Sequence, residues 1–280
     1  SGCGKTSIAL TLLRLLPDNA KFLGGSVLFE GVDLVRIPEE EMRKIRWRGI
    51  SMIFQAAMNS LNPVYRVGDQ IIEAIQTHFP ITYQEARKRV AELFDLVGLA
   101  PELMDRYPHE YSGGMKQRAV IAMALSCSPK LVIADEPTTA LDVIVQDRIL
   151  RRIDEVRKQL NMAMLYISHD IAVIAEVSQR IGVMYAGNLV EFADTVTIFK
   201  NPAHPYTIAL MSAFPSIKGE KRKLQGLPGE PPDLLRPPSG CRFHPRCPFA
   251  TAVCTESPPE YREIHPQHYV ACWHPQVGRS

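Results

Sequence analysis

Residues 111–142 read YSGGMKQRAVIAMALSCSPKLVIADEPTTALD, and this stretch decides the fold class of the chain. Ser112 and two glycines open a helical pattern, so free backbone N–H groups and the positive end of a helix face the same way, as anion binding requires. Leu131–Ala134 is a short apolar run typical of a buried parallel strand, and it delivers Asp135 and Glu136 to its carboxyl end. Ligands of doubly wound α/β sheets bind at that edge. The stretch therefore predicts an α/β protein with a phosphate site.

Two adjacent acidic residues at a strand end can have separate roles in phosphoryl transfer. Asp135 can bind Mg²⁺, a hard cation that keeps its waters, and Glu136 can polarise an attacking water. An isolated Asp-Glu pair is more often a solvated strand end. Here the pair follows a glycine-led helix and is followed by Pro137 and by residues 140–142, so several motifs stand in fixed order.

This order resembles the signature, Walker B and D-loop segment of ABC-type ATPases. The resemblance implies an ABC-type P-loop ATPase domain, with a mixed sheet core and a helical subdomain, and a head-to-tail dimer in which the signature contacts the γ-phosphate of ATP on the partner subunit. It implies nucleotide contacts for Tyr111, Ser112, Gly113, Gly114, Met115, Lys116, Gln117 and Asp142.

The first seven residues, SGCGKTS, resemble the second half of a P-loop. Gly2 and Gly4 let the backbone wrap phosphates, Lys5 reaches the β- and γ-phosphates, and Thr6 offers a hydroxyl to Mg²⁺. The full motif has a glycine five positions before Gly4, upstream of Ser1, so we expect an N-terminally truncated chain that lacks the first strands and binds ATP weakly by itself. The predicted nucleotide contacts here are Ser1, Gly2, Cys3, Gly4, Lys5, Thr6 and Ser7.

Two further strand ends carry polar residues. The apolar run Gly49–Phe54 leads to Gln55, which resembles the Q-loop glutamine that ligates Mg²⁺ or its water. The run Ala163–Ile167 leads to His169; a lone histidine is more often structural, but the resemblance implies a switch role at the γ-phosphate. We therefore expect Glu136 and His169 as catalytic residues, with Glu136 as the main water-polarising group. The expected Mg²⁺ ligands are Thr6, Gln55 and Asp135.

Periodicity predicts the remaining elements. The expected helices are Ile8–Leu16, Met42–Arg48, Val67–Ile75, Ala86–Leu96 and Val145–Leu160. The expected strands are Gly24–Asp33, Arg180–Tyr185 and Asn188–Glu191. We expect the ATPase domain to span residues 1–215, with the helical subdomain at about 56–125, and a small cysteine-containing extension to span 216–280.

Three segments indicate a subfamily. They resemble segments of the ATPases of dipeptide, oligopeptide and nickel importers. The segments are Asn59–Pro63 with the following Val67-Gly68, the HPYT element at His204–Thr207 and the proline-rich residues 226–240. The resemblance implies an ATP-hydrolysing subunit at the cytoplasmic face of the membrane. Its implied partners are a second ATPase subunit, with a heterodimer favoured, two membrane permease subunits and an extracytoplasmic solute-binding protein. A soluble ABC ATPase of translation or DNA repair, a nickel importer subunit and a degenerate non-hydrolysing subunit are the alternatives.

The composition limits the possible fold classes and partners. The net charge is +2, and 46% of the residues are apolar, so we expect a sizeable core and no nucleic-acid partner. The basic segment Lys218–Lys223 reads as a solvated linker. No apolar run approaches the roughly 20 residues that a membrane span needs.

Six cysteines include four near the C-terminus. We expect Cys3 and Cys127 to be packing residues. Four thiols in a proline-rich segment can supply cross-linking that a small core cannot, so a metal centre is predicted. The resemblance favours a [4Fe–4S] cluster on Cys241, Cys247, Cys254 and Cys272, while zinc and free thiols stay open. Nearby histidines that could replace a ligand are His244, His265, His268 and His274.

Overall fold

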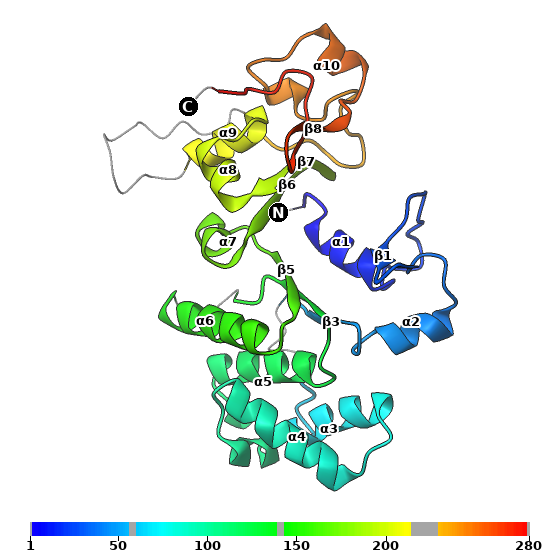
Figure 1. The fold of residues 1–280 in the computed structure, drawn as a ribbon, viewed down its shortest axis with the longest axis vertical. Helices are drawn as coiled ribbons and strands as arrows, with labels where there is room; N and C mark the ends of the chain where they lie inside the picture. The colour runs from blue at the N-terminus through cyan, green and yellow to red at the C-terminus, as the bar shows by residue number, and fades with distance from the viewer. Residues whose placement is uncertain (1, 56–59, 139–142, 214–228, 279–280) are drawn as a thin grey trace. The chain divides into compact units, whose positions relative to one another are not determined.

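A computed structural model describes residues 2–55, 60–138, 143–213 and 229–278 (Figure 1). The chain divides into two compact units. The large unit is Thr6–Asp170, and the small unit joins residues 1–5 to Ile171–Ser280. Within the described residues, no helix is both long enough and apolar enough to cross a bilayer.

The large unit is built on a three-stranded parallel sheet in the order β3-β4-β5. Its strands are β3 (Ile50–Ile53), β4 (Leu131–Asp135) and β5 (Ala163–Ile167). Ile53 pairs with Ala134, and Asp135 pairs with Ile167. The three expected strands are confirmed, and because they are parallel and in register, their carboxyl ends meet at one edge of the sheet.

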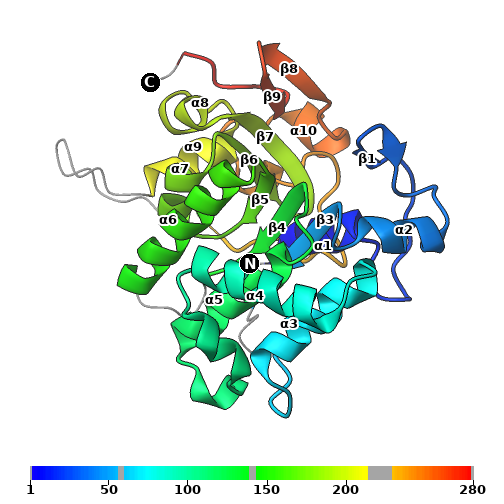
Figure 2. The same cartoon turned by 60° about the horizontal axis from the view of Figure 1, so that its bottom comes forward.

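Apolar clusters cover both faces of this sheet. Successive residues of a strand point to opposite faces, and β4 follows that rule. Val132 and Ala134 pack with the helices α3 (Val67–His78), α4 (Tyr83–Leu96) and α5 (Gly113–Leu125), which lie together in Figure 2. Ile133 packs instead with residues of the N-terminal helices. The strand is therefore buried on both sides, as its continuous apolar run predicts.

The helical part of the large unit begins after the Q-loop segment. α3 and α4 confirm two predicted helices, and the 3₁₀ turns η2 (Pro101–Asp105) and η3 (Pro108–Glu110) lead into α5. Arg87 donates two hydrogen bonds to the carboxylate of Asp105, at 2.8 and 2.7 Å, which ties α4 to η2. The helix α6 (Val143–Gln159) confirms the long helix expected after residue 142.

Two N-terminal helices differ in position from the prediction. α1 spans Lys5–Leu12 and ends well before Pro17, because Arg14 adopts the left-handed region, at φ 52°. α2 spans Glu39–Ile45, earlier than expected, and Trp47 at φ 70° prevents its continuation. Side-chain periodicity alone does not reveal where the backbone leaves the helical region.

The strand expected over Gly24–Asp33 is wrong. The structure has a hairpin of two short antiparallel strands, β1 (Leu28–Phe29) and β2 (Val32–Asp33). Glu30 and Gly31 between them both have positive φ, at 50° and 82°, as the tight turn of a two-residue hairpin requires. The glycine at position 31 thus forms a turn inside the range where one strand is expected, and the chain reverses there.

The small unit contains a four-stranded antiparallel sheet in the order β6-β7-β9-β8. β6 (Arg180–Tyr185) and β7 (Asn188–Asp194) confirm two predicted strands, and β8 (Tyr261–His265) and β9 (His268–Ala271) come from the C-terminal segment. Strands on both sides of the expected boundary after residue 215 thus share one sheet. The division into domains at that residue stays a prediction.

In the described part of the small unit, five short helical segments accompany the sheet. They are α7 (Ile171–Val177), α8 (Thr195–Lys200), α9 (Pro205–Ser212), η4 (His244–Arg246) and α10 (Ala252–Glu256). Its core contains residues of β6 and β7 together with Ile198 and Phe243, all at most 9% exposed. Phe243 comes from the cysteine-containing segment, so that segment shares the core of the sheet.

Candidate active site

Three polar side chains meet at the carboxyl edge of the parallel sheet. Gln55 follows β3, Glu136 follows β4, and His169 follows β5. The Gln55 amide Nε2 donates to Glu136 Oε2 at 3.0 Å, and His169 Nδ1 lies 3.0 Å from Glu136 Oε1. Both oxygens of one carboxylate are thus held by residues from the two flanking strands. The structure therefore brings these three predicted site residues together at one edge of the sheet.

The backbone at Glu136 is unusual. Its φ is 49°, a left-handed value that is uncommon for a residue with a side chain. Its N–H donates to the Ile167 carbonyl at 2.8 Å, which fixes the residue to the end of β5. The Glu136 side chain is 14% exposed, whereas that of His169 is 66% exposed. The Glu136 carboxylate is therefore held in a defined orientation at the carboxyl edge of the sheet, beside a solvent-exposed histidine.

Asp135 lies one residue earlier and is 1% exposed. A buried carboxylate at a strand end is a strong oxygen donor for a hard cation. The Gln55 amide and the Thr6 hydroxyl, both on exposed residues, add neutral oxygen donors in the same unit. One carboxylate with neutral oxygens and water suits Mg²⁺, which coordinates few protein ligands. The donor set therefore fits the predicted ion.

The signature glycines stand at the N-terminus of α5. Ser112 caps this helix, and its hydroxyl accepts a hydrogen bond from the Met115 N–H at 3.3 Å. A Cβ added to Gly114 would lie 3.1 Å from Val145 Cγ1 on α6, so a side chain there would press on that helix. Ser112 and Gly113 are exposed, and this leaves the helix end accessible to a ligand.

Two predicted nucleotide contacts lie in the interior. Tyr111 is 5% exposed and donates its hydroxyl to the Leu103 carbonyl at 2.5 Å, and burial raises its pKa. Gln117 is 3% exposed within α5. Met115 and Lys116 between them are half-buried. Tyr111 and Gln117 therefore have packing roles in this chain, and their contact with nucleotide stays an untested prediction.

The P-loop residues open the chain. Gly2 and Gly4 have positive φ, at 84° and 92°, as wrapping a phosphate requires. Cys3 is half-buried and accepts a hydrogen bond from Lys5 Nζ at its sulfur, 3.5 Å away, so it does more than pack. Thr6 and Ser7 are exposed on the first turn of α1.

Several predicted positions lie outside the described residues. These are Ser1, Asn59, the D-loop with Asp142, and the linker Lys218–Lys223.

Comparisons with known proteins identify the family of the chain. A family model for ABC transporters matches residues 1–139, and one for the C-terminal region of oligopeptide/dipeptide transporters matches residues 190–254. A "probable peptide ABC transporter ATP-binding protein" of Sinorhizobium fredii is 50% identical over 98% of this chain and 83% of its own length. The oligopeptide transport ATP-binding protein of Escherichia coli is 44% identical over 98% of this chain and 82% of its own length.

The chain belongs to the ATP-binding proteins of peptide-type ABC transporters. Solved ABC cassettes share the fold. A dimeric bacterial ABC transporter cassette superposes with a TM-score of 0.61 at 25% identity, over 70% of this chain and 82% of its own. A component of the Clostridium perfringens cbiONQ transporter complex has the same TM-score and identity, over 71% of this chain and 76% of its own. The predicted fold class is confirmed, and the chain is an ABC-type ATPase.

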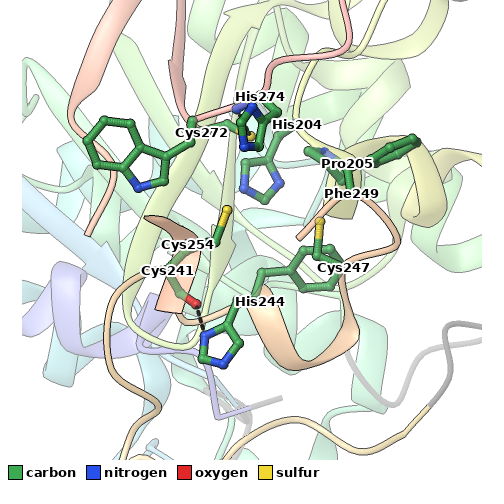
Figure 3. A pocket seen from close by; sticks show the side chains of 11 residues that line it. His204, Pro205, Cys241, His244, Cys247, Phe249, Cys254, Cys272 and His274 are labelled. Atoms are coloured by element: carbon green, nitrogen blue, oxygen red, sulfur yellow. Dashed lines mark hydrogen bonds between the residues drawn. The ribbon is translucent and has the colours of Figure 1, made fainter. Parts of the chain in front are cut away.

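This ABC ATPase also carries the predicted cysteine cluster in its small unit. Cys241, Cys247, Cys254 and Cys272 line one pocket, together with Phe243, Phe249 and His204. Figure 3 shows the sulfur atoms of Cys247 and Cys254 directed toward the side where Cys272 and His204 lie. Burial raises the pKa of the Cys241, Cys247 and Cys272 thiols, that of Cys272 to about 12. The sequence analysis thus identified four residues that the fold brings together.

The described side chains do not form a site for a single metal ion, so the zinc alternative has no support. In the described ranges, no group of three or more histidine, cysteine, aspartate or glutamate side chains is placed to hold a metal ion. His244 and His274 line the pocket, but His244 Nδ1 lies 3.0 Å from the Cys241 carbonyl oxygen and His274 Nε2 lies 2.8 Å from Thr251 Oγ1. His265 and His268 are not among the pocket-lining residues, so they are poor candidates for replacement ligands.

Sequence reasoning missed a buried polar cluster around the HPYT element of this ATPase. Glu191 has no exposed surface, and its carboxylate accepts from the N–H groups of Ala203 and His204 at 2.7 and 3.0 Å. His268 Nε2 lies 2.8 Å from the same carboxylate. Burial lowers the pKa of His204 to about 4, so its ring is neutral and Nδ1 accepts from the Tyr206 N–H. The only sequence signal was a glutamate at an inward position of β7.

Proposed function

We propose that this chain hydrolyses ATP to drive peptide import through a membrane-embedded ABC transporter. The observation that carries the proposal is the Glu136 carboxylate, held at 3.0 Å by Gln55 on one side and at 3.0 Å by His169 on the other. The names of the relatives favour peptides over nickel, since those quoted above refer to peptide or oligopeptide transport. A dipeptide transport ATP-binding protein of Caldanaerobacter subterraneus, 42% identical, adds to that support.

We infer that Glu136 polarises the attacking water. A carboxylate that is 14% exposed and oriented by two side chains can accept a proton from water without first reorganising. His169, on the exposed side, would orient the same water or bond the γ-phosphate. Gln55 would exchange its bond to Glu136 for one to the nucleotide or to a metal-bound water.

The phosphate-binding groups would come from the P-loop and from the signature of a partner subunit. Residues 2–7 would wrap and neutralise the β- and γ-phosphates through backbone N–H groups and Lys5. Thr6, Gln55 and Asp135 would hold Mg²⁺, which when bound neutralises phosphate charge. Ser112, Gly113 and Gly114, at the accessible end of α5, would face the γ-phosphate of ATP bound on the partner chain.

We infer that the partners are a second, non-identical ATPase subunit, two permease subunits and a solute-binding protein, which places the chain at the cytoplasmic face of the membrane. The helical part offers a docking surface to a permease. An open groove runs between α3 and the start of α4, and it combines apolar with acidic side chains. The groove is lined by Asp69, Ile72, Glu73, Gln76, Thr77 and Tyr83.

We further propose that the four pocket cysteines hold an iron–sulfur cluster. The support is their convergence on one pocket and the affinity of thiolates for iron. An inorganic cluster spans more space than a single ion, so four cysteines that form no single-ion site among the described residues could still ligate it. Because three of the thiols have a raised pKa, cluster assembly must remove protons from them.

The test of the proposed function is Glu136→Gln in the full-length protein assembled with its membrane partners. We expect phosphate release to fall at least about a hundredfold, the usual contribution of a general base, while Mg-ATP affinity stays within about twofold of wild type. Glu176→Gln changes an exposed glutamate on α7 in the same way and should leave turnover unaffected. Unchanged phosphate release in Glu136→Gln would remove Glu136 from the role of base.

A further inference from the structure

We propose that Arg242 is a positioning residue for the P-loop, acting from the cysteine-containing segment through the β6–β7 turn. The inference rests on the phosphate-binding role proposed above for residues 2–7. All the contacts that carry it lie within the small unit. They form a chain of backbone and side-chain contacts from Arg242 to Cys3.

The first step joins the P-loop to the turn. The Gly187 N–H donates to the Cys3 carbonyl at 3.1 Å. Gly4 packs against the same turn, since a Cβ added to it would lie 3.8 Å from Gly187 Cα and 3.8 Å from Met184 Cε. The P-loop backbone therefore rests on the turn between β6 and β7.

The second step joins the turn to Arg242. Ala186 and Gly187 both have positive φ, at 47° and 84°, so the turn is a tight one that favours glycine at its second position. The Arg242 guanidinium donates through Nη1 to the Ala186 carbonyl. A hydrogen bond from a charged donor is stronger than a neutral one. The Ala186 carbonyl and the Gly187 N–H belong to one planar peptide group, so Arg242 holds the same group that donates to Cys3.

The arginine itself is anchored by its neighbours. Phe243 is 1% exposed and packs edge-to-face on Tyr185, with ring centroids 5.1 Å apart. The Cys241 N–H donates to the Cys254 carbonyl at 2.8 Å. Arg246 adds a second contact to the same region, because its Nη1 donates to the Tyr185 hydroxyl at 3.3 Å. These contacts fix the backbone on both sides of Arg242, so its side chain is held next to the β6–β7 turn.

A brace of this kind matters because the P-loop is intrinsically flexible. Its glycines at φ 84° and 92° allow the phosphate-wrapping conformation, but they allow many others as well. Ordering such a loop at the moment of binding costs affinity, whereas a loop held in advance avoids that cost. The segment that carries the cysteines therefore contributes to ATP affinity although it follows the P-loop by more than 200 residues.

The experiment compares Arg242→Met with Arg242→Lys in the full-length protein assembled with its membrane partners. Arg242→Met keeps the length of the side chain but removes its donors, and we expect the Kd for Mg-ATP to rise about ten- to a hundredfold, the range expected for one charge-assisted hydrogen bond. Arg242→Lys keeps a charged donor and should stay within about threefold of wild type. The KM for ATP should rise with the Kd while kcat changes little.

Two controls separate the outcomes. Arg262→Met alters an exposed arginine on β8 and should leave the Kd unchanged. Lys5→Ala tests the phosphate site itself, and it should abolish tight binding. Normal Mg-ATP affinity in Lys5→Ala would refute the proposed P-loop role. Two other results would overturn only the role of Arg242. The first is loss of binding in Lys5→Ala together with normal affinity in Arg242→Met. The second is an equal loss of affinity in Arg242→Met and Arg242→Lys.

Discussion

Glu191 shows at the level of single residues how a buried charge is tolerated. Its carboxylate accepts two backbone N–H groups, those of Ala203 and His204, and faces His268 Nε2 at 2.8 Å. A buried ion without such partners would cost several kcal/mol. These contacts hold the start of the HPYT element and strand β9 against β7. The cluster therefore stabilises the small unit, which also contains the contacts from Arg242 that support the P-loop.

Replacing His268 should destabilise this cluster. In His268→Ala we expect the free energy of unfolding of the small unit to fall by about 3 kcal/mol, because a buried carboxylate loses a hydrogen-bonding partner. Hydrogen exchange of the β9 amides under native conditions measures this loss for the small unit alone.

His268→Gln retains an N–H donor and should recover part of the loss. His265→Ala, on the exposed face of β8, is the matched control, and we expect it to change stability by no more than about 0.5 kcal/mol. Equal effects at the two histidines would contradict a specific role for the Glu191 contact.

At the level of elements, α4 shows a local signal that the sequence carries in full. Thr82 accepts from the Glu85 N–H at 3.3 Å, and Glu85 Oε2 accepts from the Thr82 N–H at 2.8 Å, which together form a capping box. The hydrogen bonds from Thr82 also lower the pKa of Glu85. These groups satisfy helix-end donors that would otherwise need water.

Removal of the cap should cost a modest, measurable amount. We expect Thr82→Ala to lower the free energy of unfolding of the large unit by about 1 kcal/mol, the usual value for an N-cap. Urea unfolding followed by circular dichroism checks this value. Thr77→Ala removes a hydroxyl that only bonds back to the Glu73 carbonyl within α3, so it should change stability little. A larger loss at Thr77 than at Thr82 would refute the capping role.

At the level of the whole molecule, the C-terminal segment depends on few buried apolar side chains. Among the described residues from 229 onward, the buried hydrophobic side chains are Phe243, Cys254 and Val270. The segment depends on the core that it shares with β6 and β7, and a bound group would add cross-linking that its own few buried side chains do not supply. The pocket lined by four cysteines is where such a group would act.

The cluster proposal predicts a composition. Protein purified anaerobically should contain iron and acid-labile sulfide in equal amounts and absorb near about 400 nm, as iron–sulfur proteins with thiolate ligands do. Cys254→Ser should lose most of the iron and lower the melting temperature, whereas Cys127→Ser, a buried cysteine of the large unit, should keep the iron. Stoichiometric zinc, or four alkylatable thiols with no metal, would contradict the cluster.

The position of the candidate site at the sheet edge was largely predictable because its residues follow strands. Gln55, Asp135, Glu136 and His169 each stand just after an apolar run, and parallel strands bring their carboxyl ends to one edge. The errors lie where the backbone turns within a continuing pattern, at Glu30 in the β1–β2 hairpin and after α2, where Trp47 has φ 70°. Burial of Tyr111 was also missed, because position beside a motif does not indicate exposure.

The sequence by itself determined the strands of the parallel sheet, the helices α3 to α6, the motifs and the set of four cysteines, since each depends on residues close together in the chain or on a pattern repeated along it. Only the tertiary structure decided which side chains meet across long separations. Three hydrogen bonds illustrate this: Gln55 to Glu136 joins residues 81 positions apart, His268 to Glu191 joins residues 77 apart, and Arg242 to Ala186 joins residues 56 apart. Such contacts depend on how strands pair and how the sheet edges align, and no local pattern of residues encodes that arrangement.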